Sequence, residues 1–92
     1  MTDALGEELE GGDLILHIDT RHGQRTLGVY NGKQTKKGRP YFLAYYRYGS
    51  PEERIRKECA SNSWALIKIT EEQLRRSGYP EQVEALLELK ED

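Results

Sequence analysis

Hydrophobic and polar residues alternate along several short stretches of the chain, which is the pattern of half-buried β-strands. The stretches with this pattern or with a β-rich composition are residues 13–19, 25–30, 41–48 and 64–69. The third of these has five aromatic residues in eight positions, and both of its faces are partly apolar. We therefore expect it to be a central strand, with Phe42 and Ala44 on the face that points into the core.

The pattern changes to that of two helices near the end of the sequence. Thr70 and Gln73 have the spacing of a capping box, in which each side chain bonds the backbone amide of the other residue. Gly78 is suited to end this short helix, and Pro80 to begin a second helix that runs through Lys90.

A third helix is predicted before the last strand. Ser50 and Pro51 form a typical helix start, with a capping hydroxyl followed by proline at the first helical position. Ile55 and Cys59 then share one helical face, so we predict about two helical turns over residues 52–60.

The segments between these elements are polar. Asn31 and Gly32 form a tight-turn dipeptide, and residues 31–40 as a whole are predicted to be an exposed, mobile and basic loop. Gly28, inside the second strand, indicates a bulge or a strong bend. The predicted core consists of Leu14, Leu16, Phe42, Trp64 and one of Leu66 and Ile67.

Strand number and spacing decide the fold class. Four or five short strands within about sixty residues cannot all be parallel, because each parallel crossover needs a dozen or more residues. We predict a mainly β (α+β) fold, a small antiparallel SH3-like barrel with short C-terminal helices. Residues 1–12 are expected to be an acidic flexible tail, residues 13–70 the barrel, and residues 71–92 helices packed on it.

The amino-acid composition excludes several classes of protein. Ninety-two residues with 36% hydrophobic and 33% charged side chains suit one small domain. A single cysteine excludes an internal disulfide and a multi-cysteine zinc site. The apolar runs are too short for a membrane span, and the first residues lack the pattern of a secretory signal. We therefore expect a cytoplasmic protein that does not associate with membranes.

The order of strands resembles that of a known group of folds. The start Gly12-Asp13-Leu14-Ile15, followed by a glycine-bent second strand, is similar to the entry of SH3-like and KOW-like barrels. Many small proteins of tailed phages look similar, with a closing strand of the form seen at residues 64–69 leading into a capped helix. The resemblance covers about residues 12–70 and implies a small barrel.

Charge is distributed unevenly along the chain. The net charge is −6 over residues 1–19, +8 over residues 20–70 and −4 over residues 71–92. The stretch between Thr20 and Tyr48 contains seven Lys or Arg residues and no acid. Such a local field can attract a polyanion even though the whole protein is mildly acidic. The alternative is that the basic centre is neutralised by the acidic ends of the same chain.

Basic residues beside an aromatic strand favour nucleic-acid binding, because Lys and Arg contact phosphates while aromatic rings stack on bases. The candidate nucleic-acid-binding residues are Arg25, Lys33, Lys36, Lys37, Arg39, Tyr41, Tyr45 and Arg47. DNA and RNA remain equally open as the ligand. The alternative function is that of an adaptor or inhibitor that binds a protein, as phage-encoded proteins bind host proteins.

Signals for catalysis are weak. His17, Asp19 and His22 could in principle ligate a metal, but their spacing alone is a weak signal. Cys59 would need a histidine within hydrogen-bond reach to act as a nucleophile, and the more common role of such a cysteine is packing. The glycines and lysines of residues 32–38 lack the spacing of a phosphate-binding loop. We therefore expect a non-enzymatic binding module without a cofactor.

Overall fold

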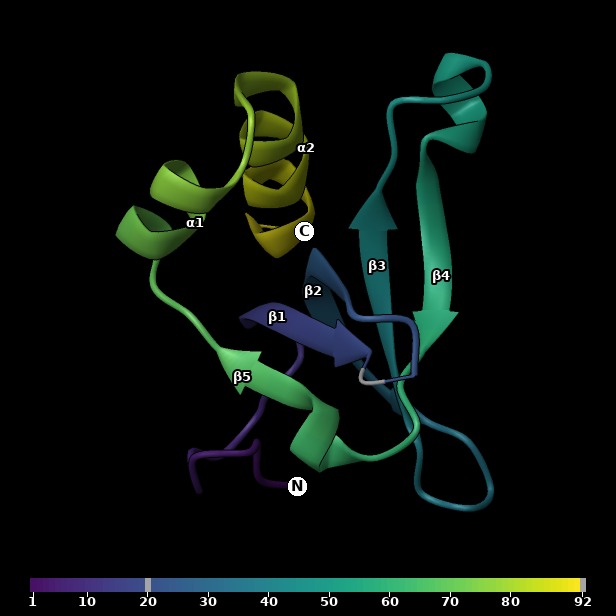
Figure 1. Cartoon of the computed structure of the whole chain (residues 1–92), viewed down its shortest axis with the longest axis vertical. Coiled ribbons are helices and arrows are strands. Elements are labelled where there is room, and N and C mark those ends of the chain that lie inside the picture. Colours follow the sequence, from purple (N-terminus) through teal and green to yellow (C-terminus); the bar gives the residue numbers. More distant parts are fainter. Residues whose placement is uncertain (20, 92) are drawn as a thin grey trace.

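One antiparallel sheet of five strands is the main element of the chain, in a computed structural model that describes residues 1–19 and 21–91 (Figure 1). The strands are β1 (Leu14–Asp19), β2 (Gln24–Gln34), β3 (Pro40–Tyr45), β4 (Ile55–Cys59) and β5 (Leu66–Lys68). Their order in the sheet is β4-β3-β2-β1-β5, so β5 returns to pair with β1. The predicted mainly β, antiparallel fold is confirmed, and the sheet is open, with β4 and β5 as its edges.

Two helices follow the sheet, as predicted. α1 (Glu71–Ser77) begins after Thr70, whose Oγ1 accepts a hydrogen bond from the Gln73 amide at 3.1 Å. Gln73 Oε1 accepts the reciprocal bond from the Thr70 amide at 2.8 Å, which confirms the capping box. α2 (Pro80–Glu91) follows directly. No helix in the described part of the chain is long and apolar enough to cross a membrane.

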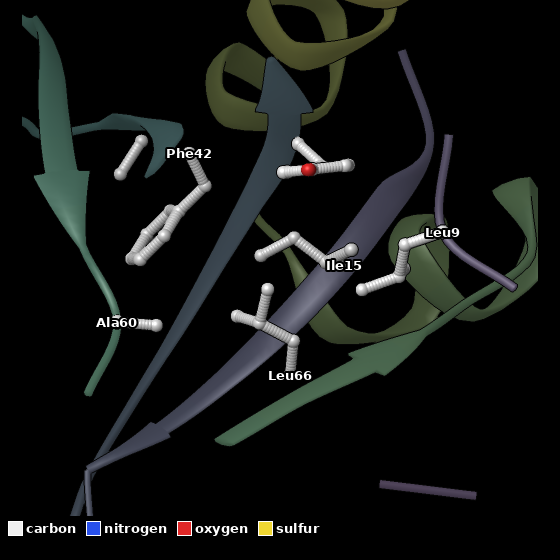
Figure 2. Close-up of a cluster of buried hydrophobic side chains, with 7 residues drawn as sticks. Leu9, Ile15, Phe42, Ala60 and Leu66 are labelled. Carbon is white, nitrogen blue, oxygen red and sulfur yellow. The ribbon is translucent and has the colours of Figure 1, made fainter. Parts of the chain in front are cut away.

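Both faces of the sheet are covered by hydrophobic side chains. On one face, the helices α1 and α2 pack against β1 and β2. The buried residues of this helix-side core are Leu14, Leu27, Val29, Leu74, Val83 and Leu86. On the other face, side chains from β1, β3 and β5 converge (Figure 2). The buried residues of this strand-side core are Leu9, Ile15, Tyr30, Phe42, Ala44, Ala60 and Leu66.

Gly28 lies where β2 and β3 approach each other closely beside the strand-side core. A Cβ atom at this position would come within 2.6 Å of the Leu43 carbonyl oxygen and 2.8 Å of the Phe42 ring. Glycine is therefore required by the close approach of β2 and β3 rather than by a special φ angle.

The first twelve residues are not the flexible tail that was expected. Ala4 donates a backbone hydrogen bond to the Leu66 carbonyl oxygen at 2.9 Å, and the Asp3 carboxylate accepts one from the Lys68 amide at 2.7 Å. Leu9 is buried in the strand-side core. The segment is held because β5 offers it unpaired backbone groups, which a short sequence window does not reveal.

The helix predicted over residues 52–60 is wrong. One 3₁₀ turn, η1 (Pro51–Glu53), uses the proline start, and the chain then forms β4 along the whole length of β3. Ile55 and Cys59 lie on one side in a strand as well as in a helix. The segment forms a strand because it pairs with β3, whose outer edge would otherwise be unpaired.

Trp64 is not in the core, contrary to the prediction. It lies in a second 3₁₀ turn, η2 (Ser63–Ala65), with 76% of its surface exposed. The strand begins two residues later, so Leu66 enters the core instead. The prediction is confirmed for Phe42 and Leu14, which are fully buried.

The basic segment of residues 31–40 is only partly a loop. Asn31 and Gly32 lie inside β2, and the expected tight turn at this dipeptide is wrong. Gly32 has a φ of 80° at a register irregularity between β2 and β3. Pairing resumes at Gln34 opposite Pro40, so the hairpin loop consists of residues 35–39.

Candidate nucleic-acid interface

The tip of the β2–β3 hairpin presents four basic side chains on an ordered backbone. Lys33, Lys36, Lys37 and Arg39 are all exposed. Thr35 organises the loop, since its amide donates to the Arg39 carbonyl oxygen at 2.9 Å and its Oγ1 accepts from the Arg39 amide at 3.1 Å. The loop therefore holds its cations in a defined place rather than on a random coil.

The described acidic residues at the two ends of the chain form no ion pair with the basic centre. Within the described residues, none of the ten Lys and Arg side chains from Arg21 to Lys57 has a carboxylate within 4.0 Å. The terminal acids are engaged elsewhere: Asp13 pairs with Lys68 at 3.4 Å, and Glu8 with the N-terminal amine at 2.9 Å. The central cations thus remain available to an external anion.

A hollow of about 620 Å³ opens beside this hairpin. It forms where the end of β1, the turn after it, the hairpin and the segment between β4 and β5 meet. Arg21 and Arg39 line it from two of these segments, and Asn62 and Trp64 line it from a third. Its size is within the range of about 300–1,000 Å³ that small-molecule sites have.

Trp64 is the functional candidate that the sequence prediction missed. It is the only tryptophan of the chain, and its exposed ring lies on the wall of the hollow. A large aromatic ring is seldom left this exposed when packing alone decides its position. The polar run Ser61-Asn62-Ser63 before it was the available signal that Trp64 belongs to a turn and not to a strand.

Two histidines of the hollow have different surroundings. His17 is half-buried, with its ring centroid 4.9 Å from that of Phe42. Burial lowers the pKa of His17 more than Asp19 and Glu58 raise it, so the ring is neutral at pH 7. His22 is exposed and shares a hydrogen bond of 2.8 Å with Asp19, and this bond is the main reason why the pKa of Asp19 is lowered.

These groups do not form a metal site. No cluster of three or more His, Cys, Asp or Glu side chains in residues 1–19 and 21–91 has the arrangement to hold a metal ion. The weak metal signal from His17, Asp19 and His22 therefore has no geometric support.

The predicted aromatic residues are split between two places. Tyr41 follows the hairpin loop, and the Lys57 ammonium lies 4.6 Å from the centre of its ring. Tyr45 lies at the other end of β3, where it packs on the helix-side core and against Tyr79 at 6.0 Å. Tyr45 therefore does not present a free face beside the basic loop.

Two predicted arginines also lie away from the loop. Arg47 stacks over the Tyr79 ring at 3.8 Å, near the connection between α1 and α2. Arg25 pairs with Ile18 at the end of β2 that is opposite the hairpin loop. The structure thus brings together Lys33, Lys36, Lys37, Arg39 and Tyr41, and it places Arg25, Tyr45 and Arg47 elsewhere.

Comparisons with known proteins give no further guidance on these residues. No model of a known protein family matches the chain, and neither the curated proteins nor the solved structures that were searched contain a match.

Proposed function

We propose that the protein binds single-stranded nucleic acid, with one base stacked on Trp64 in the hollow. The phosphates on either side of that base contact the basic residues of the hairpin loop. The observation that carries the proposal is the exposed Trp64 ring, which lines the same hollow as Arg21 and Arg39.

The chemistry of the hollow suits a nucleotide. Arg21 and Arg39 supply donors for phosphate oxygens, and Arg is especially suited to this role because its guanidinium is planar and always charged. The Asn62 amide carries both donors and an acceptor that can bond the edge of a base. His17, neutral at pH 7, adds one donor and one acceptor.

A single strand fits this arrangement better than a duplex. Bases in a duplex are stacked on each other, and a protein ring reaches their faces only after they are unstacked. Stacking on an aromatic side chain contributes about 1–3 kcal/mol per base and tolerates any base. Trp64 supplies such a platform, and the lysines of the loop add attraction that does not depend on sequence.

We also propose that the sheet is an open relative of the SH3-like barrel. Two features support this assignment: the return of the last strand to the first, and the close approach of β2 to β3 that requires glycine at position 28. On this view the hollow lies at the end of the barrel where the β1–β2 turn, the β2–β3 loop and the turn before β5 meet.

The test uses Trp64 itself as the probe. Because it is the only tryptophan, emission excited at wavelengths that the six tyrosines do not absorb reports on the proposed site alone. We expect single strands of about ten nucleotides, a length within the usual site size, to quench this emission and duplexes to quench it less. Trp64→Ala should weaken the binding of a labelled single strand, measured by fluorescence anisotropy, by about 1–3 kcal/mol.

The control changes charge without touching the hollow. Arg75 and Arg76 lie on α1, where each is paired with a glutamate one turn earlier. The double variant Arg75→Gln/Arg76→Gln should leave binding unchanged, whereas Arg21→Gln/Arg39→Gln should weaken it. Absence of binding to any DNA or RNA single strand at low salt would refute the proposal.

A further inference from the structure

The two edges of the sheet are treated differently by the rest of the chain. The β5 edge is covered by the N-terminal segment through the Ala4 amide, which bonds Leu66, and the Asp3 carboxylate, which bonds the Lys68 amide. Among the residues that the structure describes, no segment bonds the outer edge of β4, which forms the outer side of the sheet in Figure 1. Only one edge is therefore open to another strand.

The outward backbone groups of β4 can be identified from its pairing. The Arg54 carbonyl oxygen accepts from Tyr46, and the Ala60 amide donates to Pro40, so these two residues face β3. In an antiparallel pair the residues alternate between facing the partner strand and facing away. Ile55, Lys57 and Cys59 thus direct their amides and carbonyl oxygens outward. Apart from the pairing with β3, the described residues provide no backbone hydrogen bond from β4 to a loop or another element.

Most devices that block an edge strand are absent from β4. Natural proteins protect edges with proline, bulges or very short strands. β4 has five residues, contains no proline, and keeps one continuous register with β3. The remaining device is charge: Arg56 and Lys57 lie in the strand with a single acid, Glu58.

The charges along this edge select for an acidic partner. Arg54, Arg56 and Lys57 have no ion-pair partner among the residues that are described. The one acid of the strand, Glu58, accepts a hydrogen bond from the Tyr46 hydroxyl at 3.0 Å. Arg54 donates to the Tyr45 hydroxyl at 3.4 Å and Arg56 to the Glu53 carbonyl oxygen at 3.2 Å, but neither bond neutralises the charge. A basic strand would be repelled here, whereas an acidic strand would bring its carboxylates opposite these cations.

We propose that β4 binds an acidic, extended segment of another protein, which pairs with it as a sixth strand of the sheet. Backbone hydrogen bonds to Ile55, Lys57 and Cys59 hold the segment. Side chains alternate between the two faces of a strand, so acidic side chains on one face contact Arg54 and Arg56, and those on the other face contact Lys57. This mode of recognition takes affinity from the backbone and specificity from the side chains. The inference does not depend on the nucleic-acid proposal, because Trp64 and Arg21 take no part in it.

The first experiment uses a synthetic peptide of about eight residues, a length typical of a strand, in which pairs of Glu alternate with pairs of Val. This order places Glu on both faces of the extended peptide. Isotope-labelled full-length protein is titrated with this peptide and followed by NMR. We expect the largest amide shifts at Ile55, Lys57 and Cys59, and slower hydrogen exchange of these three amides. The same peptide with Lys in place of each Glu should not bind. Shifts confined to Trp64 and Arg21, or no shifts at millimolar peptide, would overturn the proposal.

The second experiment separates backbone pairing from charge attraction. The same Glu-Val peptide, N-methylated at every second residue along one side, keeps its charge and loses half of its backbone donors. Its affinity should fall by at least about tenfold, which corresponds to about 1.4 kcal/mol. Equal affinity of the two peptides would mean that only charge is recognised and would overturn strand pairing.

Two variants at Lys57 complete the test. Lys57→Gln removes the charge and keeps the outward amide, whereas Lys57→Pro removes both and leaves the bonds to β3 in place. Peptide affinity should fall in the order wild type, Lys57→Gln, Lys57→Pro, with binding of single-stranded nucleic acid at Trp64 retained in both variants. Self-association of the free protein that Lys57→Pro abolishes would identify a second copy as the occupant and overturn an acidic partner.

Discussion

The Asp3 side chain attaches the N-terminal segment to the edge of the sheet. Its carboxylate accepts backbone hydrogen bonds from Leu5 at 2.9 Å, Glu7 at 2.8 Å and Lys68 at 2.7 Å, and only 3% of the residue is exposed. Burial raises the pKa of Asp3, but the three bonds and the charge of Lys68 outweigh it, so the pKa is lowered from 3.8. The ionised form is therefore the one that the folded protein stabilises.

Replacing Asp3 should consequently weaken the protein in a pH-dependent way. We expect Asp3→Asn to lower the free energy of unfolding at pH 7 by about 1–3 kcal/mol, because the Asn NH₂ group faces a backbone donor that the carboxylate accepted. The contribution of Asp3 is complete above its unfolded pKa of about 3.9 and disappears as the pH falls through the lower folded value. Urea denaturation at pH 7 and at about pH 2.5 measures the difference. Equal loss at both values would contradict this account.

Tyr46 is the second residue whose environment makes a measurable prediction. Burial, followed by the hydrogen bond that its hydroxyl donates to Glu58, raises the pKa of Tyr46 to about 12. The ionisation of Tyr46 should therefore appear as a late step in an absorbance titration of the protein. Glu58→Gln should lower this pKa, since the phenolate would no longer face a carboxylate. The late step should vanish in Tyr46→Phe, and its persistence would assign it to another tyrosine.

At the scale of elements, the sequence predicts correctly the features that depend on interactions between nearby residues. The capping box of α1 involves residues three apart, and it is present as expected. The 52–60 segment was assigned wrongly because Ile55 and Cys59 share a side in either structure, and the decision comes from pairing with the distant β3. The expectation that Trp64 lies in the core is wrong because β5 begins where it pairs with β1. That pairing joins residues about fifty positions apart, so the local sequence does not reveal it.

The candidate site likewise has a part that the sequence predicts and a part that depends on the folded chain. The lysines of the hairpin loop were predictable, because a polar run with glycines forms an exposed loop in almost any context. The hollow was not predictable, since it is assembled from four segments that only the folded sheet brings together. Tyr45 was expected to face a ligand, but the helices that cover it are attached through the return of β5 to β1.

The hairpin loop should act as an electrostatic element independent of the base that is bound. The triple variant Lys33→Ala/Lys36→Ala/Lys37→Ala should flatten the dependence of the logarithm of affinity on the logarithm of salt concentration by about 2 for a single strand, at about 0.7 per phosphate contact. The change should be nearly the same for different sequences. Anisotropy titrations at several salt concentrations measure the slope, with Arg75→Gln/Arg76→Gln as the control for charge. An unchanged slope in the triple variant would move the phosphate contacts away from the loop.

The whole molecule depends on a sheet that is buried on both faces. Leu14 and Ile15 are neighbours in β1, and they point into the helix-side and strand-side cores respectively. A chain of 92 residues could not build two independent cores of useful size. The two cores are joined because they share one sheet. We therefore infer that the strands and the helices unfold together.

This shared sheet makes a prediction about two matched substitutions on opposite faces. Phe42 is 1% exposed in the strand-side core, and Leu74 is fully buried in the helix-side core. We expect Phe42→Ala to cost about 3–5 kcal/mol and Leu74→Ala about 2–5 kcal/mol. Since small domains have only about 5–15 kcal/mol of stability in total, either change should lower the melting temperature by well over ten degrees.

The form of the transition distinguishes a single cooperative unit from two. Far-ultraviolet circular dichroism reports mainly on α1 and α2, and hydrogen exchange of β1 to β3 reports on the sheet. Trp64 emission is a poor probe of unfolding, because the ring is already 76% exposed in the folded state. If the sheet couples both cores, Leu74→Ala should shift the helix signal and the strand exchange by the same amount, and Phe42→Ala should do so too. Helices that melt first in Leu74→Ala, with the strands still protected, would show that the strand-side core folds alone and that the helices are an addition to it.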